Sequence, residues 1–136
     1  MVSSLADEIK TFNKDRLMIS IHSKYKVIHI SKEVVRALKA PMFICLKVNA
    51  DWTSVALVSC KEKDRLSFRV PEDLFIDNNV GFRICSKEFV TVLLGKNKMS
   101  DDNTYRIYGE YKPENNAIVF QMSDAKILLH PEDEEE

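Results

Sequence analysis

The side chains best suited to binding another molecule are five cations between residues 24 and 39, namely Lys24, Lys26, Lys32, Arg36 and Lys39. Ammonium and guanidinium groups at this density can neutralise phosphates, which predicts a surface that follows a nucleic-acid backbone. Lys26 and Arg36 are the candidates for direct contact, and the other three support them. Arg36 is the sole arginine of the group, so planar donors for reading bases are scarce. A solvated, solubilising face is the alternative interpretation.

The sequence gives weaker indications of a metal site or a catalytic site. His22 and His29 are seven residues apart and have no third ligand at metal spacing, so we expect no metal site. The sequence has no paired nucleophile and base, no paired-carboxylate motif, no phosphate-binding loop and no glycine-rich dinucleotide turn. We therefore expect no enzyme activity and no cofactor.

The cysteines bear on the compartment. Cys45, Cys60 and Cys85 are odd in number, lack C-x-x-C spacing and lie inside apolar runs. This pattern favours reduced, buried thiols over a disulfide framework, although Cys45 and Cys60 could face each other across a hairpin. No apolar stretch approaches the roughly 18–20 residues of a membrane span, and the N-terminal residues lack the apolar segment of a signal peptide. The expected location is the cytoplasm, without membrane contact.

The net charge of -1, from 20 Lys and Arg against 21 Asp and Glu, is unevenly distributed. Residues 20–65 hold nine cations and four acids, and residues 82–130 hold seven cations and six acids. The basic charge is therefore concentrated in the first half, whereas residues 132–136 are all acidic. We interpret this acidic end as a solvating tail. The alternative is that it competes with DNA for the basic residues or docks on a basic partner.

Hydrophobic periodicity predicts the elements that position these residues. An amphipathic helix is expected over residues 1–16, and Ser31 and Ser86 are expected N-caps of two short helices, the second ended by Gly95. Trp52, in a bend between two strands, is either an exposed anchor for a partner or a ring folded onto the strand edge. The short helices are expected at residues 32–38 and 87–94, and the strands at 17–21, 25–30, 43–48, 55–60, 66–70, 82–85, 104–111 and 117–122.

The order of these elements occurs twice. The segment Ile30–Val35 matches Cys85–Val90 at an offset of 55 residues, and Leu38 then corresponds to Leu93. This match indicates a duplicated unit of two strands, a capped helix and a hairpin. The expected boundaries are residues 1–16 for the N-terminal helix, 17–65 for the first unit, 66–126 for the second unit and 127–136 for the acidic tail.

The segment Lys26–Leu38 resembles the signature of the SpoVT/AbrB superfamily. In that signature a basic residue enters a strand that ends at a helix start, followed by an acid, a basic helix residue and a leucine. Two copies in one chain are similar to the tandem proteins of the MraZ type. The resemblance implies a mainly β fold with short helices, in which two tandem β-β-α-β-β units interlock as a swapped-hairpin β-barrel. One unit alone is too small to bury its apolar faces, which agrees with this arrangement.

The same resemblance implies a cytoplasmic DNA-binding transcriptional regulator, present as a homodimer or a higher homo-oligomer. The second unit has Gly81 and Thr91 at the positions of Lys26 and Arg36, so the basic positions that the family uses on DNA are present in the first unit only. The alternative function is a protein-interaction module on the same fold, such as an antitoxin-like or phage-type inhibitor without nucleic-acid binding. The neutralised second unit and the acidic tail favour this alternative.

Overall fold

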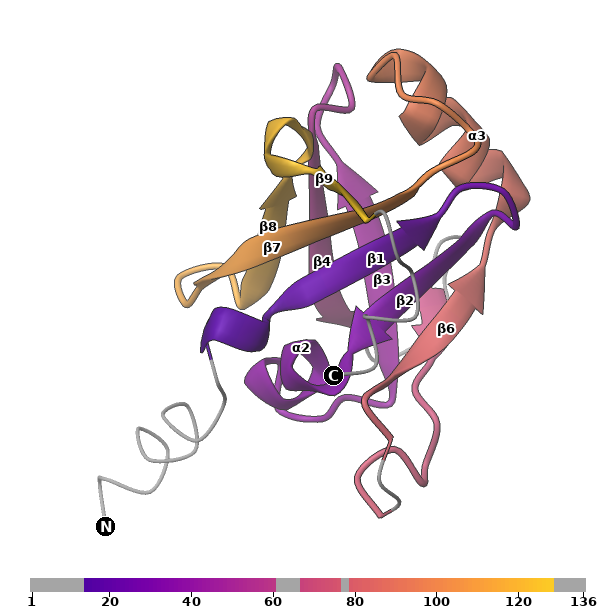
Figure 1. Ribbon diagram of the computed structural model, residues 1–136. Helices are drawn as coiled ribbons and strands as arrows, with labels where there is room; N and C mark the ends of the chain where they lie inside the picture. The colour runs from indigo at the N-terminus through magenta and orange to yellow at the C-terminus, as the bar shows by residue number, and fades with distance from the viewer. Residues whose placement is uncertain (1–13, 61–66, 77–78, 129–136) are drawn as a thin grey trace, which may run out of the picture.

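A computed structural model describes residues 14–60, 67–76 and 79–128 of the chain (Figure 1). The helices are the 3-10 helices η1 (Lys14–Arg16) and η2 (Met122–Asp124) and the α-helices α2 (Lys32–Ala37) and α3 (Lys87–Lys96). The strands are β1 (Met18–His22), β2 (Val27–Ser31), β3 (Phe43–Val48), β4 (Ser54–Cys60), β5 (Ser67–Arg69), β6 (Gly81–Cys85), β7 (Thr104–Lys112), β8 (Ala117–Gln121) and β9 (Lys126–Leu128). The mainly β class with short helices is confirmed. The expected N-terminal helix lies outside the described residues, except that residues 14–16 form η1.

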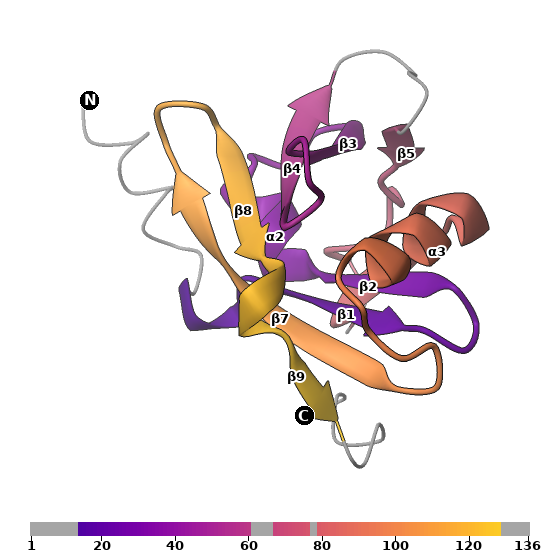
Figure 2. The ribbon, with the colours of Figure 1, turned by 90° about the horizontal axis from the view of Figure 1, so that it is seen from above.

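The strands form a nearly closed antiparallel barrel in the order β5-β3-β4-β8-β7-β1-β2-β6, with β9 paired to β7 (Figures 1 and 2). The first half of β7 pairs with β1 and the second half with β8, so this long strand joins two sheets. We call β6-β2-β1-β7-β9 sheet A and β5-β3-β4-β8-β7 sheet B. Among the described strands, the barrel is open where β5 and β6 end this order.

Gly109 lies where β7 passes from sheet A to sheet B. Its backbone N–H donates to the carbonyl of Leu17 at 2.7 Å. A Cβ at this position would lie 2.6 Å from the Phe120 ring, so a side chain would push the strand off the core. Glycine therefore allows the close approach that the strand crossing requires.

Alternate residues of the strands point into one apolar core. Sheet A contributes Ile19, Ile21, Ile28 and Ile30, and sheet B contributes Ile44, Leu46, Val55 and Leu57, all nearly inaccessible to solvent. The helices α2 and α3 lie at opposite ends of the barrel (Figure 1) and bury Val34, Val35, Phe89 and Val90. Each such side chain stabilises the fold by about 1.5–3 kcal/mol. The outward positions of the two sheets remain available for other roles.

The helix starts match the prediction, but their caps do not. Ser31 and Ser86 occupy the N-cap positions without a side-chain capping hydrogen bond. The Ser31 hydroxyl instead donates to the carbonyl of Arg16 at 2.7 Å and accepts from the N–H of Met18 at 3.3 Å. It thereby joins the end of β2 to the chain that enters β1.

The predicted stop at Gly95 is wrong, because α3 continues to Lys96. The Asn97 side chain donates to the carbonyls of Leu93 and Trp52, each at 2.9 Å, and so ties the helix end to the β3–β4 bend. The left-handed backbone conformation falls at Lys98 instead, with a φ of 54°. Trp52 folds inward, with its ring 5.3 Å from that of Phe89, so the exposed-anchor alternative is excluded.

The prediction of three reduced, buried thiols is wrong. Cys45 and Cys60 form a disulfide with a Cα–Cα distance of 6.3 Å, and Cys85 carries an exposed free thiol. The β3–β4 register explains the pairing: Cys60 lies opposite Phe43, which places it diagonally across from Cys45. The cysteines therefore no longer support a reducing compartment. Within the described residues, no helix has the length and apolar character to cross a membrane.

The end of the chain also differs from its predicted boundary. Ile127 and Leu128, the first two residues after the predicted boundary, belong to β9 and pair with β7. Residues 129–136, which carry the acidic run, lie outside the described residues. The sheet thus extends to Leu128.

Candidate anion-binding face

The five predicted contact residues fall at two separate places. Lys24 and Lys26 lie in the β1–β2 turn, whereas Lys32 and Arg36 lie on α2 and Lys39 follows it. The turn and α2 are at opposite ends of β2 (Figure 1), a strand of five residues or about 16 Å. The structure therefore does not bring the predicted set together as one patch.

Several of these cations already have partners within the chain. The Arg36 guanidinium donates to the Glu33 carboxylate at 2.6 Å and lies 5.0 Å from the centre of the Phe75 ring. Lys26 donates from its ammonium group to the carbonyl of Ser23 at 2.8 Å. These contacts hold both predicted contact residues in structural roles, because a DNA phosphate would have to compete with them.

Sequence reasoning missed a row of polar side chains across the outside of sheet A. The strand registers place Arg83 opposite His29, His29 opposite Ser20, Ser20 opposite Arg106, and Arg106 opposite Lys126. Residues opposite each other in antiparallel strands point to the same side. Five strands spaced by about 4.8 Å make this row about 19 Å long. The neighbours of Arg83, His29, Ser20 and Arg106 along their strands are buried core residues, and Lys126 itself is exposed, so the row faces outward.

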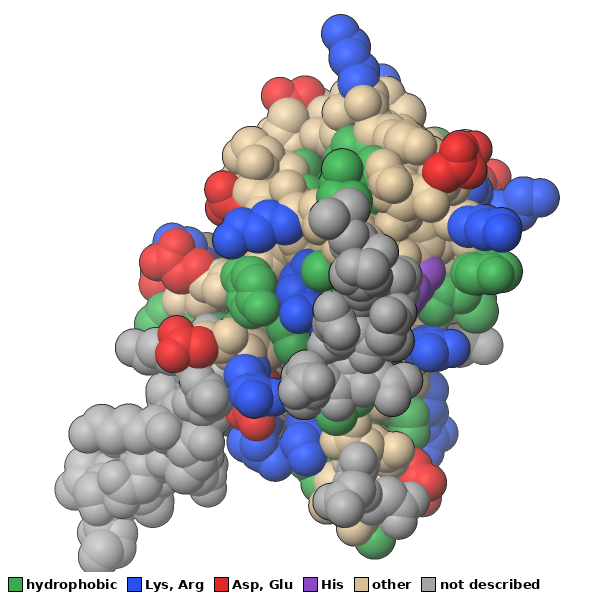
Figure 3. Space-filling model, viewed as in Figure 1, with side chains coloured by type: hydrophobic (Ala, Val, Ile, Leu, Met, Phe, Trp, Pro, Cys, Tyr) green, Lys and Arg blue, Asp and Glu red, His purple; other side chains and the backbone are tan. Residues whose placement is uncertain are grey.

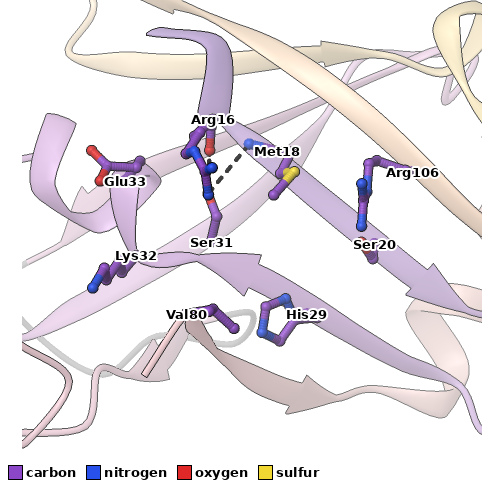
Figure 4. Close-up of a pocket in the computed structure, with 9 residues that line it drawn as sticks. All are labelled: Arg16, Met18, Ser20, His29, Ser31, Lys32, Glu33, Val80 and Arg106. Atoms are coloured by element: carbon purple, nitrogen blue, oxygen red, sulfur yellow. Dashed lines mark hydrogen bonds between the residues drawn. The ribbon is translucent and has the colours of Figure 1, made fainter. Parts of the chain in front are cut away.

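A pocket of about 60 Å³ adjoins the row on the side of η1 and α2 (Figure 4). Arg16 comes from η1, Lys32 from α2, and Arg106 from β7. In the close-up, Arg16 extends toward Ser31 and Arg106 toward Ser20. The pocket is lined by Arg16, Met18, Ser20, His29, Ser31, Lys32, Glu33, Val80 and Arg106.

We call the row and the cations of the pocket together the cationic face: Arg16, Ser20, His29, Lys32, Arg83, Arg106 and Lys126. Figure 3 views the molecule from this side and shows lysine and arginine side chains on the part of the surface that is open to view, with acidic side chains farther out. Glu33 is the one carboxylate among the described pocket residues, and its charge is directed to Arg36. The face therefore attracts anions.

His29 lies in the centre of this face as a neutral ring. Burial lowers its pKa to about 4, and the positive charges of Arg83, His22 and Arg106 contribute in the same direction. A cation is disfavoured there because desolvation and like charges both oppose it. At neutral pH the imidazole can therefore donate one hydrogen bond and accept another between two guanidinium groups.

The residues of this row are visible in the sequence, but their proximity in the folded protein cannot be inferred from it. Arg83 and Arg106 occupy outward positions of alternating strands in the second half of the chain. Their approach to His29 and Ser20 depends on which strands pair, and in which register. These pairings join residues more than fifty positions apart, which local patterns do not reveal.

Among the described residues, no three His, Cys, Asp or Glu side chains gather as metal ligands. Comparisons with protein-family models, with curated proteins and with solved structures gave no match for this chain. The SpoVT/AbrB likeness therefore rests on the segment Lys26–Leu38 and the element order alone.

Proposed function

We propose that this protein is a DNA-binding regulator that contacts the duplex through the cationic face of sheet A. The observation that carries the proposal is the row of Arg83, His29, Ser20, Arg106 and Lys126, placed side by side by the strand registers. Duplex DNA carries one negative charge for about every 1.7 Å, so a face about 19 Å long spans many phosphates. Arginines at the two ends of the His29–Ser20 pair add planar donors to the single arginine of α2, Arg36.

The ligand proposed here is still nucleic acid, but the contact is assigned to different residues. Of the original five residues, Lys32 remains in the site because it lines the pocket. Arg83 and Arg106 come from the second predicted unit, so both halves of the chain contribute to the face. The loss of basic residues at Gly81 and Thr91 then does not argue against DNA binding.

We further propose that the barrel is a tandem swapped-hairpin barrel. Along the sheet, the hairpin β3–β4 is followed by β8–β7 from the second half and then by β1–β2 from the first. Exchanging the two halves turns the pair β1–β7 into β5–β3, and both pairs are present. Among the described strands, β5 and β6 lack the pairing that β1 and β2 have. This alternation of hairpins is what a swap between two repeated units would produce.

The proposal is tested by titrating a fluorescent duplex with the full chain at about 50 mM and about 200 mM salt. The double variant Arg83→Gln/Arg106→Gln should bind at least tenfold more weakly, with a salt slope lower by about 2. The matched control Lys47→Gln/Lys87→Gln removes two exposed cations that are not part of the cationic face and should bind like the wild type. Equal loss in both variants, or binding insensitive to salt, would overturn the proposal.

A protein-interaction module remains the second candidate, favoured by exposed apolar residues at the open edge of the barrel. In the β5–β6 connection, Phe75, Ile76 and Val80 are 40%, 80% and 45% exposed. Large apolar side chains grouped on a surface are typical of protein contacts. This candidate predicts no duplex binding at either salt concentration and a purified protein whose 260/280 nm absorbance ratio is that of protein alone.

A further inference from the structure

We propose that the pocket beside the row is a discrete site for one phosphoryl group. The inference builds on the proposed function, since the same face is involved, but it concerns a bound anion rather than a docked duplex. A free phosphate ion and a backbone phosphate of DNA share the relevant chemistry.

The charges of the pocket point to an anion. Arg16, Lys32 and Arg106 bring three permanent cations from three separate elements to a single cavity. Glu33 opposes them, but its Oε2 lies 2.6 Å from Nη1 of Arg36, which directs its negative charge to that partner. Cations that line one cavity from several elements suit a multiply charged tetrahedral anion better than a planar carboxylate.

One hydrogen-bond donor of a residue that lines the pocket is unsatisfied. The Nε of Arg106 is buried and has no hydrogen-bond partner among the described residues. A buried guanidinium N–H without an acceptor is costly, and native proteins nearly always provide one. A phosphoryl oxygen in the pocket would fill this role.

The neutral groups of the pocket are arranged to support such a ligand. Ser31 does not need the ligand, because its hydroxyl already joins the Arg16 carbonyl to the Met18 N–H. It thereby fixes the backbone that carries Arg16. The hydroxyl of the buried Ser20 and the neutral ring of His29 remain as donors on the pocket floor. Met18 and Val80 supply apolar walls, which strengthen electrostatic contacts by excluding water.

The size of the pocket limits the ligand. A volume of about 60 Å³ corresponds to a few water molecules, because each needs about 10–15 Å³ by this measure. A tetrahedral phosphate fits this space, whereas a nucleobase or a larger cofactor does not. The site is therefore expected to bind the phosphoryl group and leave the rest of its carrier outside.

The experiment follows the His29 imidazole by NMR while inorganic phosphate is added to the full chain at constant ionic strength. We expect a saturable one-to-one shift and a rise of the His29 pKa from about 4, because a bound anion favours the imidazolium. The charged and titratable groups that face this ring or its pocket are His22, Arg83, Arg106, Arg16, Lys32 and Glu33. Acetate at the same concentration should leave the ring signals unchanged.

Variants distinguish a specific phosphate site from nonspecific electrostatic attraction. Arg106→Gln should weaken phosphate binding at least tenfold, and Arg16→Gln provides the same test if the first variant does not fold. Lys47→Gln, on sheet B, should bind phosphate like the wild type. A linear shift without saturation, or equal weakening by Lys47→Gln, would overturn the phosphoryl site.

A competition experiment distinguishes this inference from the proposed function. It also distinguishes free phosphate from a DNA backbone phosphate as the source of the phosphoryl group. If the pocket takes a backbone phosphate, inorganic phosphate at its saturating concentration should displace the fluorescent duplex more than chloride at equal ionic strength does. Saturable phosphate binding by a chain that does not bind duplex supports the pocket and rejects the DNA proposal. Salt-dependent duplex binding without any effect of phosphate on His29 supports the DNA proposal and rejects the pocket.

Discussion

The outer faces of sheets A and B differ although both sheets close the same core. Across sheet A the central row is Arg83, His29, Ser20, Arg106 and Lys126. The corresponding row across sheet B is Ser67, Cys45, Val58, Ala117 and Lys112. The inward residues of both sheets are aliphatic and aromatic, so the fold does not require this difference. Function is therefore expected on the sheet whose outward residues cost stability.

Sheet A carries such a cost. Arg106 lies opposite Lys126, and His29 lies opposite Arg83, so like charges and a desolvated imidazole are neighbours. Like charges directly opposite each other destabilise a strand pair. In sheet B a disulfide joins Cys45 to Cys60 across β3 and β4. One sheet is thus cross-linked, while the other carries repulsion that a bound anion would relieve.

The largest expected effect concerns the cross-link of sheet B. Closing a loop of 15 residues stabilises a fold by about 3 kcal/mol, so Cys45→Ala/Cys60→Ala should lower the free energy of unfolding by about 2–4 kcal/mol. Urea denaturation of the variant, and of the wild type with and without reductant, measures this effect. Duplex binding by the folded variant should be unchanged, and a matching loss of binding would show that the two faces are not independent.

The same substitution, glycine to alanine, should change stability in opposite directions at two positions, because one glycine is closely surrounded and the other is not. A Cβ at Gly81 would collide with the Ile30 backbone and lie 2.8 Å from the His29 ring, whereas one at Gly95 would meet no atom within 4 Å. Gly81→Ala should therefore destabilise the protein by about 1–3 kcal/mol. Gly95→Ala, inside α3, should stabilise it by about 0.5–1 kcal/mol. Thermal unfolding of both variants checks the two signs; destabilisation by both substitutions would contradict the described α3.

Single cations of the two sheets should differ in their effect on duplex affinity. Lys126→Gln should weaken binding by about tenfold and reduce the salt slope by about 1, as expected for one lost phosphate contact. Lys47→Gln, with the same change in charge, should leave both quantities unchanged. Anisotropy titrations over a salt series provide the comparison, and equal slopes for the two variants would remove the distinction between the faces.

The smallest expected effect is the pH dependence that His29 adds to stability. Its pKa is about 4 in the folded protein and about 6.5 when unfolded, so the unfolded chain binds the proton first. The free energy of unfolding should therefore fall as the pH decreases from about 6.5 to about 4, by about 1 kcal/mol after solvent screening is allowed for. Urea denaturation at pH 7.5 and 4.5 measures the fall. His29→Gln should reduce the fall, and an undiminished fall in His29→Gln would assign it to other groups.

Local patterns predicted the elements well, because periodicity and caps are properties of neighbouring residues. The strand Phe43–Val48 and the start of α2 at Lys32 match the expectation. The stop at Gly95 failed because Asn97 bonds to Trp52, a tertiary contact that extends the helix. Whether Cys45 and Cys60 form a disulfide depends on the register between β3 and β4, which local sequence patterns do not give.

The candidate site was harder to predict than the fold for the same reason. Lys24 and Lys32 are close in sequence but lie at opposite ends of β2, whereas Arg83 and His29 are distant in sequence and adjacent in space. Charge counted along the chain therefore did not indicate which side chains the fold brings together. Strand pairing, rather than composition, assembled the cationic face.

The most direct test of the difference between the sheets is to follow backbone amide signals of the full chain by NMR as a duplex is added at low salt. We expect saturable changes at Ser20, His29, Arg83 and Arg106, with Cys45, Val58 and Ala117 unaffected. Changes centred on sheet B or on the β1–β2 turn, or no changes at all, would contradict the assignment of the cationic face.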